Sequence, residues 1–409
     1  MPSFQLPKAV RRVADSAASA GGHAYVVGGS VRDHLLGRTH HDWDLEVFGL
    51  TAEELEVVLR RLGKVNAVGR AFGVFKIRAG RHEIDVSIPR RDSKVGPGHK
   101  GIAVSGDPDM PPREAARRRD LTVNAIMYDT VTNEIFDPFH GVGDLKDGLL
   151  RPVDETTFLE DPLRALRAIQ FAARLGFRAT DDLCGLCRAA SLGELPAERI
   201  QGEWKKLLLQ GTHIAHGLAL ARATDVHQRC FPEAGETSSH DAALDRLAAG
   251  PRQALTADGP KWTVMLAVWL HGRPIAAVEA TLDRLWLHRV DGYDVRARTV
   301  AAITHRAHGF ETDADLRWLS TRSHPAVHLR MAHAVSPEAG ADLALTRAQE
   351  LGIDHEPPTP LLRGRDLLSH GHAPGPALGQ ILERVYAQQL DGAVETLEDA
   401  LAAAKPSPS

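Results

Sequence analysis

Two acidic residues one position apart form the first chemical pattern in the sequence. Asp42 and Asp44 stand on either side of Trp43, where a short apolar run predicts a β-strand. Because residues i and i+2 of a strand point to the same face, both carboxylates can converge on one site. Such a pair suits Mg²⁺, which commonly binds one or two carboxylates together with substrate phosphates. Two metal ions in one site would activate an attacking oxygen and stabilise a leaving one.

A glycine pair precedes these acids. The run VVGG leads from a predicted strand into Gly28 and Gly29, and a predicted helix follows with Ser30 and Arg32. Glycines at such a turn let the backbone approach a phosphate, and the helix start offers unpaired N–H groups beside the Arg32 guanidinium. A lone glycine pair is usually an ordinary turn, and a lone Asp-x-Asp pair is often a solvated strand end. Together in one short stretch they favour nucleotidyl transfer.

Two further polar clusters lie downstream. Asp85, in EIDVS, is on a predicted strand that could pair beside the first two acids and supply a third catalytic carboxylate; a merely solvated acid is the alternative. In RRDLTVNA, Asp120 could accept a hydrogen bond from a ribose hydroxyl, while Arg119 could meet a triphosphate or brace Asp120. A basic stripe before a strand explains the same residues without a ligand, and Asn124 has a structural interpretation as well.

The stretch DPLR combines a helix start with a donor and an acceptor. Asp161 and Pro162 predict an N-cap and a first-turn proline, and Arg164 follows on the same helix face as Asp161. On their Watson–Crick edges, cytosine and adenine present an amino donor beside a ring acceptor. A carboxylate only accepts and a guanidinium only donates, so an Asp/Arg pair matches these two bases and opposes guanine and uracil. The alternative is a capping aspartate with an exposed arginine.

The elements that must position these residues fall into two parts. Short β-branched runs predict strands within the first 150 residues, at 24–29, 44–48, 74–79 and 83–88. Between them, SVRDHLL and TAEELEVVLRRLG predict helices, the second beginning with a capping box of Thr51 and Glu54. After Asp161 the strand patterns nearly vanish and apolar residues recur at helical spacing.

The coarse prediction is an α+β fold. An N-terminal head with a small mixed β-sheet would be followed by an elongated, all-helical neck, body and tail. The expected domains are the catalytic head at 1–150, a neck with the DPLR stretch at 151–220, a body at 221–355 and an RNA-binding tail at 356–409.

Composition sets outer limits on the function. The chain has 409 residues, of which 43% are hydrophobic and 25% charged, as expected for a globular protein of several domains. A net charge of -4 excludes a uniformly basic, histone-like binder, although a phosphate site needs only a local basic face. Three cysteines form no disulfide framework, and no apolar run approaches the length of a membrane span. We therefore expect a soluble, cytoplasmic protein without a membrane segment.

Several motifs together resemble those of the bacterial-type (class II) tRNA nucleotidyltransferases, the CCA-adding enzymes of the polymerase-β nucleotidyltransferase superfamily. The resemblance rests on GGSVRD followed by DWD, and on segments at 118–129 (RRDLTVNAIMYD), 160–177 (EDPLRALRAIQFAARLGF), 195–209 (LPAERIQGEWKKLLL) and 362–392. It spans most of the chain and is weakest around 215–355.

The resemblance implies an activity and a set of site residues. The activity would be template-independent addition of CCA to the tRNA 3′ end from CTP and ATP, with Mg²⁺ on Asp42 and Asp44. The second motif would hold the ribose, and Asp161 with Arg164 would read the base in place of a template. The residues expected to contact the nucleotide are Gly28, Gly29, Ser30, Arg32, Arg119, Asp120, Asn124, Asp161, Arg164 and Arg167.

Other functions remain open at this point. A partial enzyme that adds only CC or only A would share every motif. A bacterial poly(A) polymerase would share the head, although RAFGV at 70–74 is more similar to the CCA-adding enzymes. A catalytically inactive RNA-binding scaffold is a third alternative, against which both acids and Arg32 are intact. Two basic segments, 91–101 and 363–368, are expected to touch RNA through its phosphates and shape.

Two patterns are set aside. Cys184 and Cys187 form a CxxC, but a structural zinc site normally needs four ligands, so we interpret the pair as helix packing. His240-Asp241 and His271-Gly272 are reminiscent of an HD phosphohydrolase, but no further histidine and aspartate can be assigned to complete such a site.

Overall fold

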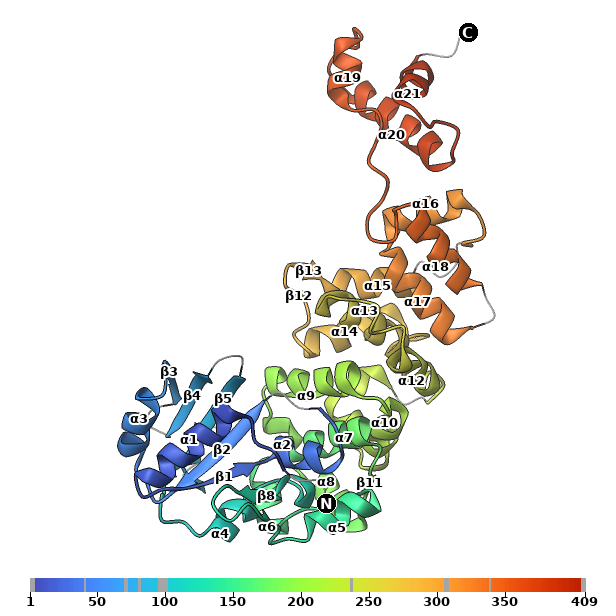
Figure 1. The fold of residues 1–409 in the computed structure, drawn as a ribbon. Helices are drawn as coiled ribbons and strands as arrows, with labels where there is room; N and C mark the ends of the chain where they lie inside the picture. Colours follow the sequence, from blue (N-terminus) through green and yellow to red (C-terminus); the bar gives the residue numbers. More distant parts are fainter. Residues whose placement is uncertain are drawn as a thin grey trace. The chain divides into compact units, whose positions relative to one another are not determined.

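A computed structural model describes residues 4–39, 42–69, 73–79, 82–94, 102–235, 238–304, 309–337 and 340–405. These residues form two compact units (Figure 1), one of Met1–Leu207 with His216–Cys230 and the other of Leu208–Ala215 with Phe231–Ser409. The predicted head and most of the predicted neck therefore belong to one unit. The finer division into four domains stays a prediction.

The first unit is built on a seven-stranded mixed sheet in the order β3-β4-β5-β2-β1-β8-β9. Its strands are β1 His23–Val27, β2 Trp43–Phe48, β3 Val65–Gly69, β4 Val74–Ala79, β5 His82–Ser87, β8 Met127–Asp129 and β9 Ile135–Phe136. Only the β2–β5 pair is parallel. The α+β class and the small mixed sheet of the head are confirmed, and the four predicted strands correspond to β1, β2, β4 and β5. The short pairs β6 Arg90–Lys94 with β7 Ile102–Gly106, and β10 Leu149–Leu150 with β11 Arg178–Ala179, lie apart from this sheet.

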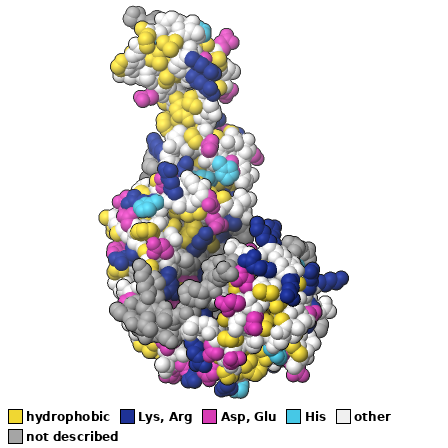
Figure 2. All heavy atoms as spheres, turned by 90° about the vertical axis from the view of Figure 1, so that its left-hand side faces the viewer, with side chains coloured by type: hydrophobic (Ala, Val, Ile, Leu, Met, Phe, Trp, Pro, Cys, Tyr) yellow, Lys and Arg dark blue, Asp and Glu magenta, His cyan; other side chains and the backbone are white. Residues whose placement is uncertain are grey.

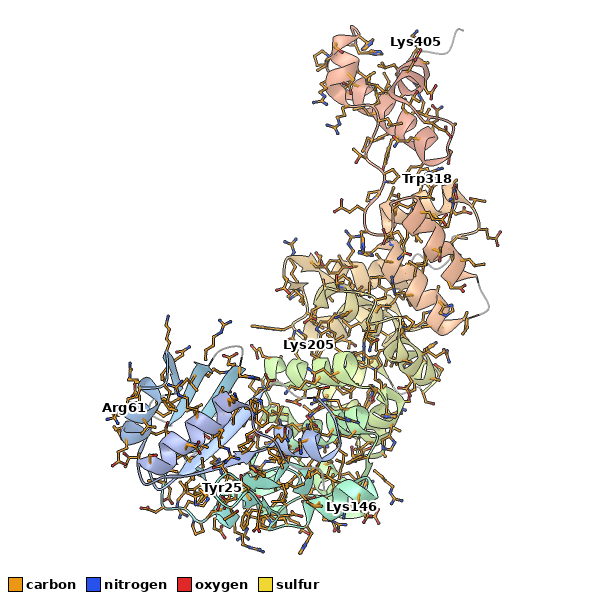
Figure 3. The ribbon with its side chains drawn as sticks, viewed as in Figure 1. Tyr25, Arg61, Lys146, Lys205, Trp318 and Lys405 are labelled. Carbon is orange, nitrogen blue, oxygen red and sulfur yellow. The ribbon has the colours of Figure 1, made fainter. Side chains whose placement is uncertain are left out.

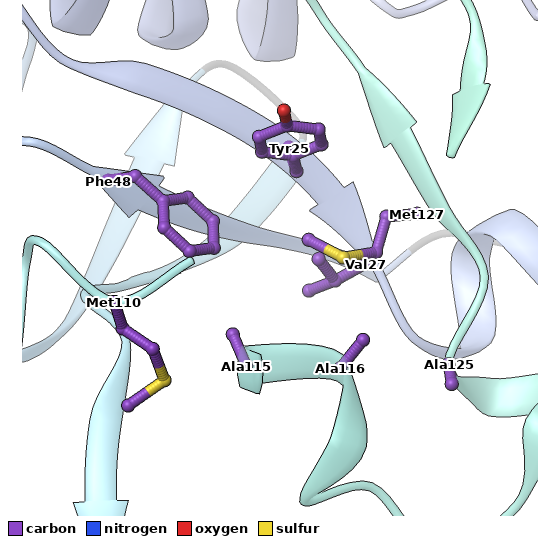
Figure 4. Close-up of a cluster of buried hydrophobic side chains, with 8 residues drawn as sticks. All are labelled: Tyr25, Val27, Phe48, Met110, Ala115, Ala116, Ala125 and Met127. Carbon is purple, nitrogen blue, oxygen red and sulfur yellow. The ribbon is translucent and has the colours of Figure 1, made fainter. Parts of the chain in front are cut away.

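Successive side chains of the central strands point to opposite faces of the sheet, and the two faces differ in composition. On β2, Trp43 and Leu45 are buried on one face, while Asp44 and Glu46 point to the other. The second face continues into an apolar cluster that includes Tyr25 from β1 (Figure 4). The same strand thus contributes apolar residues to the core and acidic residues to the site.

Helices surround this sheet and continue beyond it. They are α1 Lys8–Ser19, α2 Gly29–Leu35, α3 Ala52–Arg60, α4 Pro112–Arg117, α5 Gly141–Asp147, α6 Glu155–Glu160, α7 Leu163–Leu175, α8 Asp181–Ala189, α9 Ala197–Gln210, α10 Ile214–Ala223 and α11 Val226–Cys230. The predicted capping box at Thr51 and Glu54 is present at the start of α3. Helix α1 was not among the predicted helices; it packs beside α3 and against β1 (Figure 1).

The second unit is helical apart from the two-stranded hairpin of β12 Arg289–Val290 and β13 Tyr293–Asp294. Its helices are α12 Asp241–Ala249, α13 Asp258–Trp269, α14 Ile275–Arg284, α15 Val295–Thr304, α16 Asp313–Arg322, α17 Pro325–Val335, α18 Ala341–Glu350, α19 Gly364–Ser369, α20 Pro376–Leu390 and α21 Leu397–Ala404. Helices α16–α18 and α19–α21 have separate apolar cores. Trp318, labelled in Figure 3, links them by donating to Asp391 at 2.8 Å. None of the helices described is long and apolar enough to cross a membrane.

Candidate active site

A cavity of about 750 Å³ in the first unit gathers the predicted site residues. Its lining includes every one of them except Asp85: Gly28, Gly29, Ser30, Arg32, Asp42, Asp44, Arg119, Asp120, Asn124, Asp161, Arg164 and Arg167. Residues more than a hundred positions apart in the sequence therefore share one wall. On the face shown in Figure 2, basic and acidic side chains are interspersed over much of the surface.

The turn after β1 requires glycine at its first position. Gly28 has φ +73°, in the left-handed region that favours glycine. A Cβ added there would lie 3.4 Å from Arg119 Nη1 and 3.7 Å from Asp44 Oδ2, at ordinary contact distance, so these two side chains flank the turn. Ser30 closes the turn by donating from its hydroxyl to the Val27 carbonyl at 3.2 Å. The backbone at Gly28 is consequently open to a ligand between an arginine and an aspartate.

Asp44 lies at the edge of the cavity where three acids approach one another. In the parallel β2–β5 pair it stands opposite Asp85. Asp44 remains exposed, but the protein atoms around it partly desolvate its carboxylate and raise its pKa, the charges of Asp85 and Asp42 raise it further, and Arg119 partly offsets them. Asp85 itself pairs with Lys76 on β4 at 3.1 Å. An added positive charge near Asp44 would stabilise its carboxylate.

The donor set at this edge fits a divalent cation. Asp42 and Asp44 supply carboxylate oxygens, which are the ligands that Mg²⁺ prefers, and the mutual repulsion of the acids is the kind that a cation relieves. Within the described ranges no three His, Cys, Asp or Glu side chains are arranged as a complete metal site.

A hydrogen-bonded chain of polar side chains forms another part of the cavity wall. Arg32 donates to both carboxylate oxygens of Asp33, at 2.8 and 3.0 Å, and to Asn124 Oδ1 at 2.6 Å. Asn124 in turn donates to Asp120 Oδ1 at 3.0 Å, and Arg167 Nε donates to Asp120 Oδ2 at 2.6 Å. Burial raises the pKa of Asp120, but Arg167 and these hydrogen bonds outweigh burial and lower it. Asp120 is therefore held ionised by partners from the chain itself.

An aromatic ring supports the arginines of this wall. The guanidinium carbons of Arg32, Arg167 and Arg174 lie 4.9, 5.5 and 5.6 Å from the centre of the Phe171 ring. Such distances are those of cation–π contacts. Phe171, Arg174, Asp33, Arg118, Thr39 and Lys206 also line the cavity, although the sequence analysis did not select them. Phe171 and Arg174 follow Arg167 at helical spacing, a pattern that could have indicated them.

Glu46 is another residue that the sequence analysis missed. It is buried behind the cavity wall and accepts from Arg118 Nη2 at 2.6 Å and Arg119 Nη2 at 3.2 Å. Burial raises the pKa of Glu46, and the two guanidinium groups outweigh burial and lower it. Its position two residues after Asp44 on the same strand was the available indication, because that spacing places both on one face.

Asp161 and Arg164 both line the cavity, but they do not bond to each other. Asp161 Oδ1 accepts from the Leu163 N–H at 3.1 Å, and its Oδ2 accepts from Arg199 at 2.9 Å. Arg164 donates to the carbonyls of Thr157 at 2.5 Å and Arg118 at 2.6 Å. The predicted N-cap needs correction by one residue, since α7 begins at Leu163 after Pro162, although the Asp161 carboxylate does bond to its first N–H.

The remaining sequence predictions have mixed outcomes. Cys184 and Cys187 lie in α8 as free thiols. His271 Nδ1 lies 3.1 Å from His240 Nε2. In the described part of the chain, no group of three acids, histidines or cysteines that could bind a metal surrounds these two rings. Most of 91–101 and of the RAFGV stretch at 70–74 lies outside the described residues. The segment 363–368 forms the start of α19, where Arg365 is exposed.

The N-terminal head matches a known protein family. Residues 24–151 match the poly A polymerase head domain family. This range contains the glycine turn, Asp42, Asp44 and the Arg119–Asp120 pair, but not the α7 residues that complete the cavity.

Curated relatives extend the match. The multifunctional CCA protein of Pseudomonas putida is 36% identical over 269 residues, covering 64% of this chain and 68% of that protein. That of Thioalkalivibrio sulfidiphilus is 32% identical over 344 residues, covering 81% and 75%. The match to a Vibrio vulnificus relative is 41% identical but spans 45% of each chain.

Solved structures share the fold over nearly the whole chain. The CCA-adding enzyme of Bacillus stearothermophilus, solved with CTP, has a TM-score of 0.75 at 24% identity, covering 98% of this chain and 97% of that one. The Thermotoga maritima enzyme, solved with tRNA, has a TM-score of 0.69 at 22% identity, with the same coverage. Together with relatives above 30% identity that it covers by more than two thirds, this shows that the chain belongs to the CCA-adding enzyme family of nucleotidyltransferases.

Proposed function

We propose that this chain is a template-independent polymerase that completes the 3′ end of tRNA with CCA, using CTP, ATP and Mg²⁺. One observation carries the proposal above all. A single cavity joins the Asp42–Asp44 pair, the Gly28 turn and an arginine wall to the Asp161 and Arg164 side chains. These are the parts needed to hold a metal, a triphosphate and a base. The names of the relatives, and structures of family members with CTP, ATP and tRNA, support the choice of substrates.

Enzymes of this family generally use divalent metals, and the finer assignment of Mg²⁺ to Asp42 and Asp44 is ours. When bound, the metal supplies charge neutralisation for the attacking 3′ hydroxyl and for the departing pyrophosphate. Asp42 and Asp44 would hold the metal at the start of β2, beside the glycine turn. Asp85 stands opposite Asp44 but does not line the cavity, so its role as a third catalytic carboxylate stays a prediction.

The arginine-bearing part of the cavity wall would bind and orient the nucleotide. Arg32 and Arg119 flank the glycine turn, where their charge can meet the triphosphate while the backbone N–H groups after Gly28 approach it. Asp120 uses three of roughly four acceptor positions on Leu121, Asn124 and Arg167, which leaves one for a ribose hydroxyl. The bonds from Asn124 and Arg167 keep that acceptor in place.

Base selection is assigned to Asp161 and Arg164. Without a nucleotide, their hydrogen-bonding groups are taken by Arg199 and by backbone groups within the same unit. A cytosine or adenine edge offers a donor and an acceptor in the same polarity, so the base would use the acceptor positions of the carboxylate and the N–H donors of the guanidinium that these bonds leave free. Guanine and uracil would set donor against donor, which leaves a buried group unpaired.

Addition of only CC or only A uses the same geometry, and the match of the head to poly A polymerases keeps tailing with AMP as the second candidate. We further propose a reducing cytoplasmic location, since all three cysteines are free thiols.

Incubation with tRNA transcripts that end before, within and after CC, each with one labelled NTP at a time, tests the proposal. We expect CMP on the first two transcripts and AMP only after CC. Asp44→Asn serves as the inactive control. Long AMP tails on every transcript would instead show a poly(A) polymerase, and no incorporation at all would overturn the proposal.

A further inference from the structure

Glu46 is a buried carboxylate to which the mechanism above gives no part. On β2 it follows Asp44 by two residues, and its side chain is 1% exposed. Arg118 Nη2 donates to Oε1 at 2.6 Å, and Arg119 Nη2 donates to Oε2 at 3.2 Å. Because each oxygen is taken by a different arginine, this one carboxylate holds the two guanidinium groups side by side.

The charge balance around Glu46 leaves a positive excess at the cavity. Two guanidinium groups meet one carboxylate, and both arginines line the cavity while Glu46 does not. The other terminal nitrogen of Arg119, Nη1, lies 3.4 Å from the Cβ position of Gly28 and so faces the glycine turn. A guanidinium has five donors in a fixed fork, so Glu46 can take one edge of Arg119 and leave another for an anion.

We propose that Glu46 is a positioning residue for the nucleotide: it holds Arg118 and Arg119 so that their free donors meet the triphosphate. The inference rests on the proposed function. Since the triphosphate is common to all four NTPs, Glu46 would act on the affinity for every nucleotide and not on base choice. It would also leave tRNA affinity unchanged, because nothing in this arrangement requires RNA.

Glu46→Gln tests the inference, since glutamine keeps the length but presents an amide donor to one of the two arginines. We expect KM for CTP and for ATP to rise by about 10- to 100-fold, the loss of one charge-assisted contact. The kcat value should stay within about threefold, because ground state and transition state lose the same contact. KM for tRNA should not change. Equilibrium titration with CTP, without tRNA, should show the same loss of affinity.

Glu56→Gln is the matched control. Glu56 is also buried in the first unit and also binds an arginine, Arg60 at 2.6 Å, but it does not line the cavity. It should leave all kinetic constants unchanged. Glu46→Asp keeps the charge on a shorter stem, so it should retain one arginine and give an intermediate KM, even if Glu46→Gln fails to fold.

Three results would overturn the inference. The first is a wild-type nucleotide KM in folded Glu46→Gln and Glu46→Asp. The second is a joint change in kcat and in both KM values with a lower unfolding midpoint, which would make Glu46 a structural residue. The third is an equal loss in Glu56→Gln. A wild-type protein that incorporates no nucleotide would instead count against the proposed function, while the CTP titration would still test Glu46.

Discussion

Asp44 and Asp120 line the same cavity, yet their pKa values are displaced in opposite directions. The pKa of Asp44 is raised although this residue is exposed, because nearby protein atoms partly desolvate it and neighbouring acids repel it. That of Asp120 is lowered, because Arg167 and several hydrogen bonds outweigh an even deeper burial. Burial acts in the same sense on both carboxylates, so partners account for the difference.

The difference separates two kinds of charged site. The chain supplies the counter-ion of Asp120, so this carboxylate is a fixed part of the structure that can orient a ligand. The negative charge of Asp44 is only partly compensated by groups of the chain, so this carboxylate is suited to bind a cation from solution. We therefore expect the wall around Asp120 to be complete without a ligand, and the wall around Asp42 and Asp44 to be completed by a bound cation.

The largest expected effect is on the incomplete wall. Asp44→Asn, and likewise Asp42→Asn, should lower nucleotide transfer by about a thousandfold or more, because a metal ion contributes several kcal/mol and an amide is a poor ligand for it. Affinity for tRNA should stay close to that of the wild type, as a filter-binding titration can show. Near-normal incorporation by both variants would remove the metal assignment.

Asp85→Asn, on the neighbouring strand, sharpens this result. A loss as large as that of Asp44→Asn would confirm Asp85 as the third catalytic carboxylate predicted from the sequence. Activity close to the wild type would leave it as the partner of Lys76, to which it lies 3.1 Å away.

Removing the carboxylate of the complete wall should act on stability. Asp120→Ala leaves Arg167 without its counter-ion inside the cavity wall, and breaking a buried pair in this way typically costs about 3–5 kcal/mol. Denaturant unfolding of the whole chain should show this loss in the transition of the first unit. Asp44→Asn, measured alongside, should cost nothing or slightly stabilise the unit, since it removes a repelled charge. Equal stability losses in the two variants would contradict the comparison.

The next largest expected effect is a loss of selectivity between nucleotides. Arg164→Ala and Asp161→Ala should each reduce the preference for CTP and ATP over UTP and GTP by about ten- to a hundredfold, since a good base contact is worth about 1–3 kcal/mol by analogy with DNA readout. The measurement is kcat/KM for all four NTPs. A uniform loss for every nucleotide would mean that the bonds of Arg164 to Thr157 and Arg118 are its whole role.

The smallest effect concerns pH. A carboxylate whose folded pKa is lowered, as for Asp120, contributes stability that is present above its unfolded pKa of about 4 and is lost as the pH falls through the folded pKa. Stability should therefore decline on acidification below about pH 4. Asp120→Asn should flatten this part of the profile, with unfolding followed by circular dichroism at a series of pH values. An unchanged profile in the variant would assign the acid sensitivity to other carboxylates.

Much of this site could be predicted from the sequence, because several of its features depend on residues that are close together in the chain. The i, i+2 spacing placed Asp42 and Asp44 on one face, and a glycine pair after a strand predicted the turn that Gly28 makes with its positive φ. The Thr51–Glu54 capping box was predicted for the same reason, since its partners are three residues apart. Helix α1 was missed although its buried residues Val10, Val13, Ala14 and Ala17 follow the i, i+3, i+4, i+7 spacing of an amphipathic helix.

Spacing and turn chemistry in the chain thus decided which residues could share a face, and nearly all of the predicted ones do line one cavity. Only the tertiary structure decided which charge pairs with which. Asp161 bonds to Arg199, 38 positions away, and not to Arg164, while Glu46 meets Arg118 across 72 positions. A hydrogen bond needs its atoms within about 3 Å, whereas periodicity specifies only a direction from the local axis. Packing on a common core brings distant segments within hydrogen-bond distance of each other. It therefore decides that Asp120 has a partner within the chain, whereas Asp44 is only partly compensated.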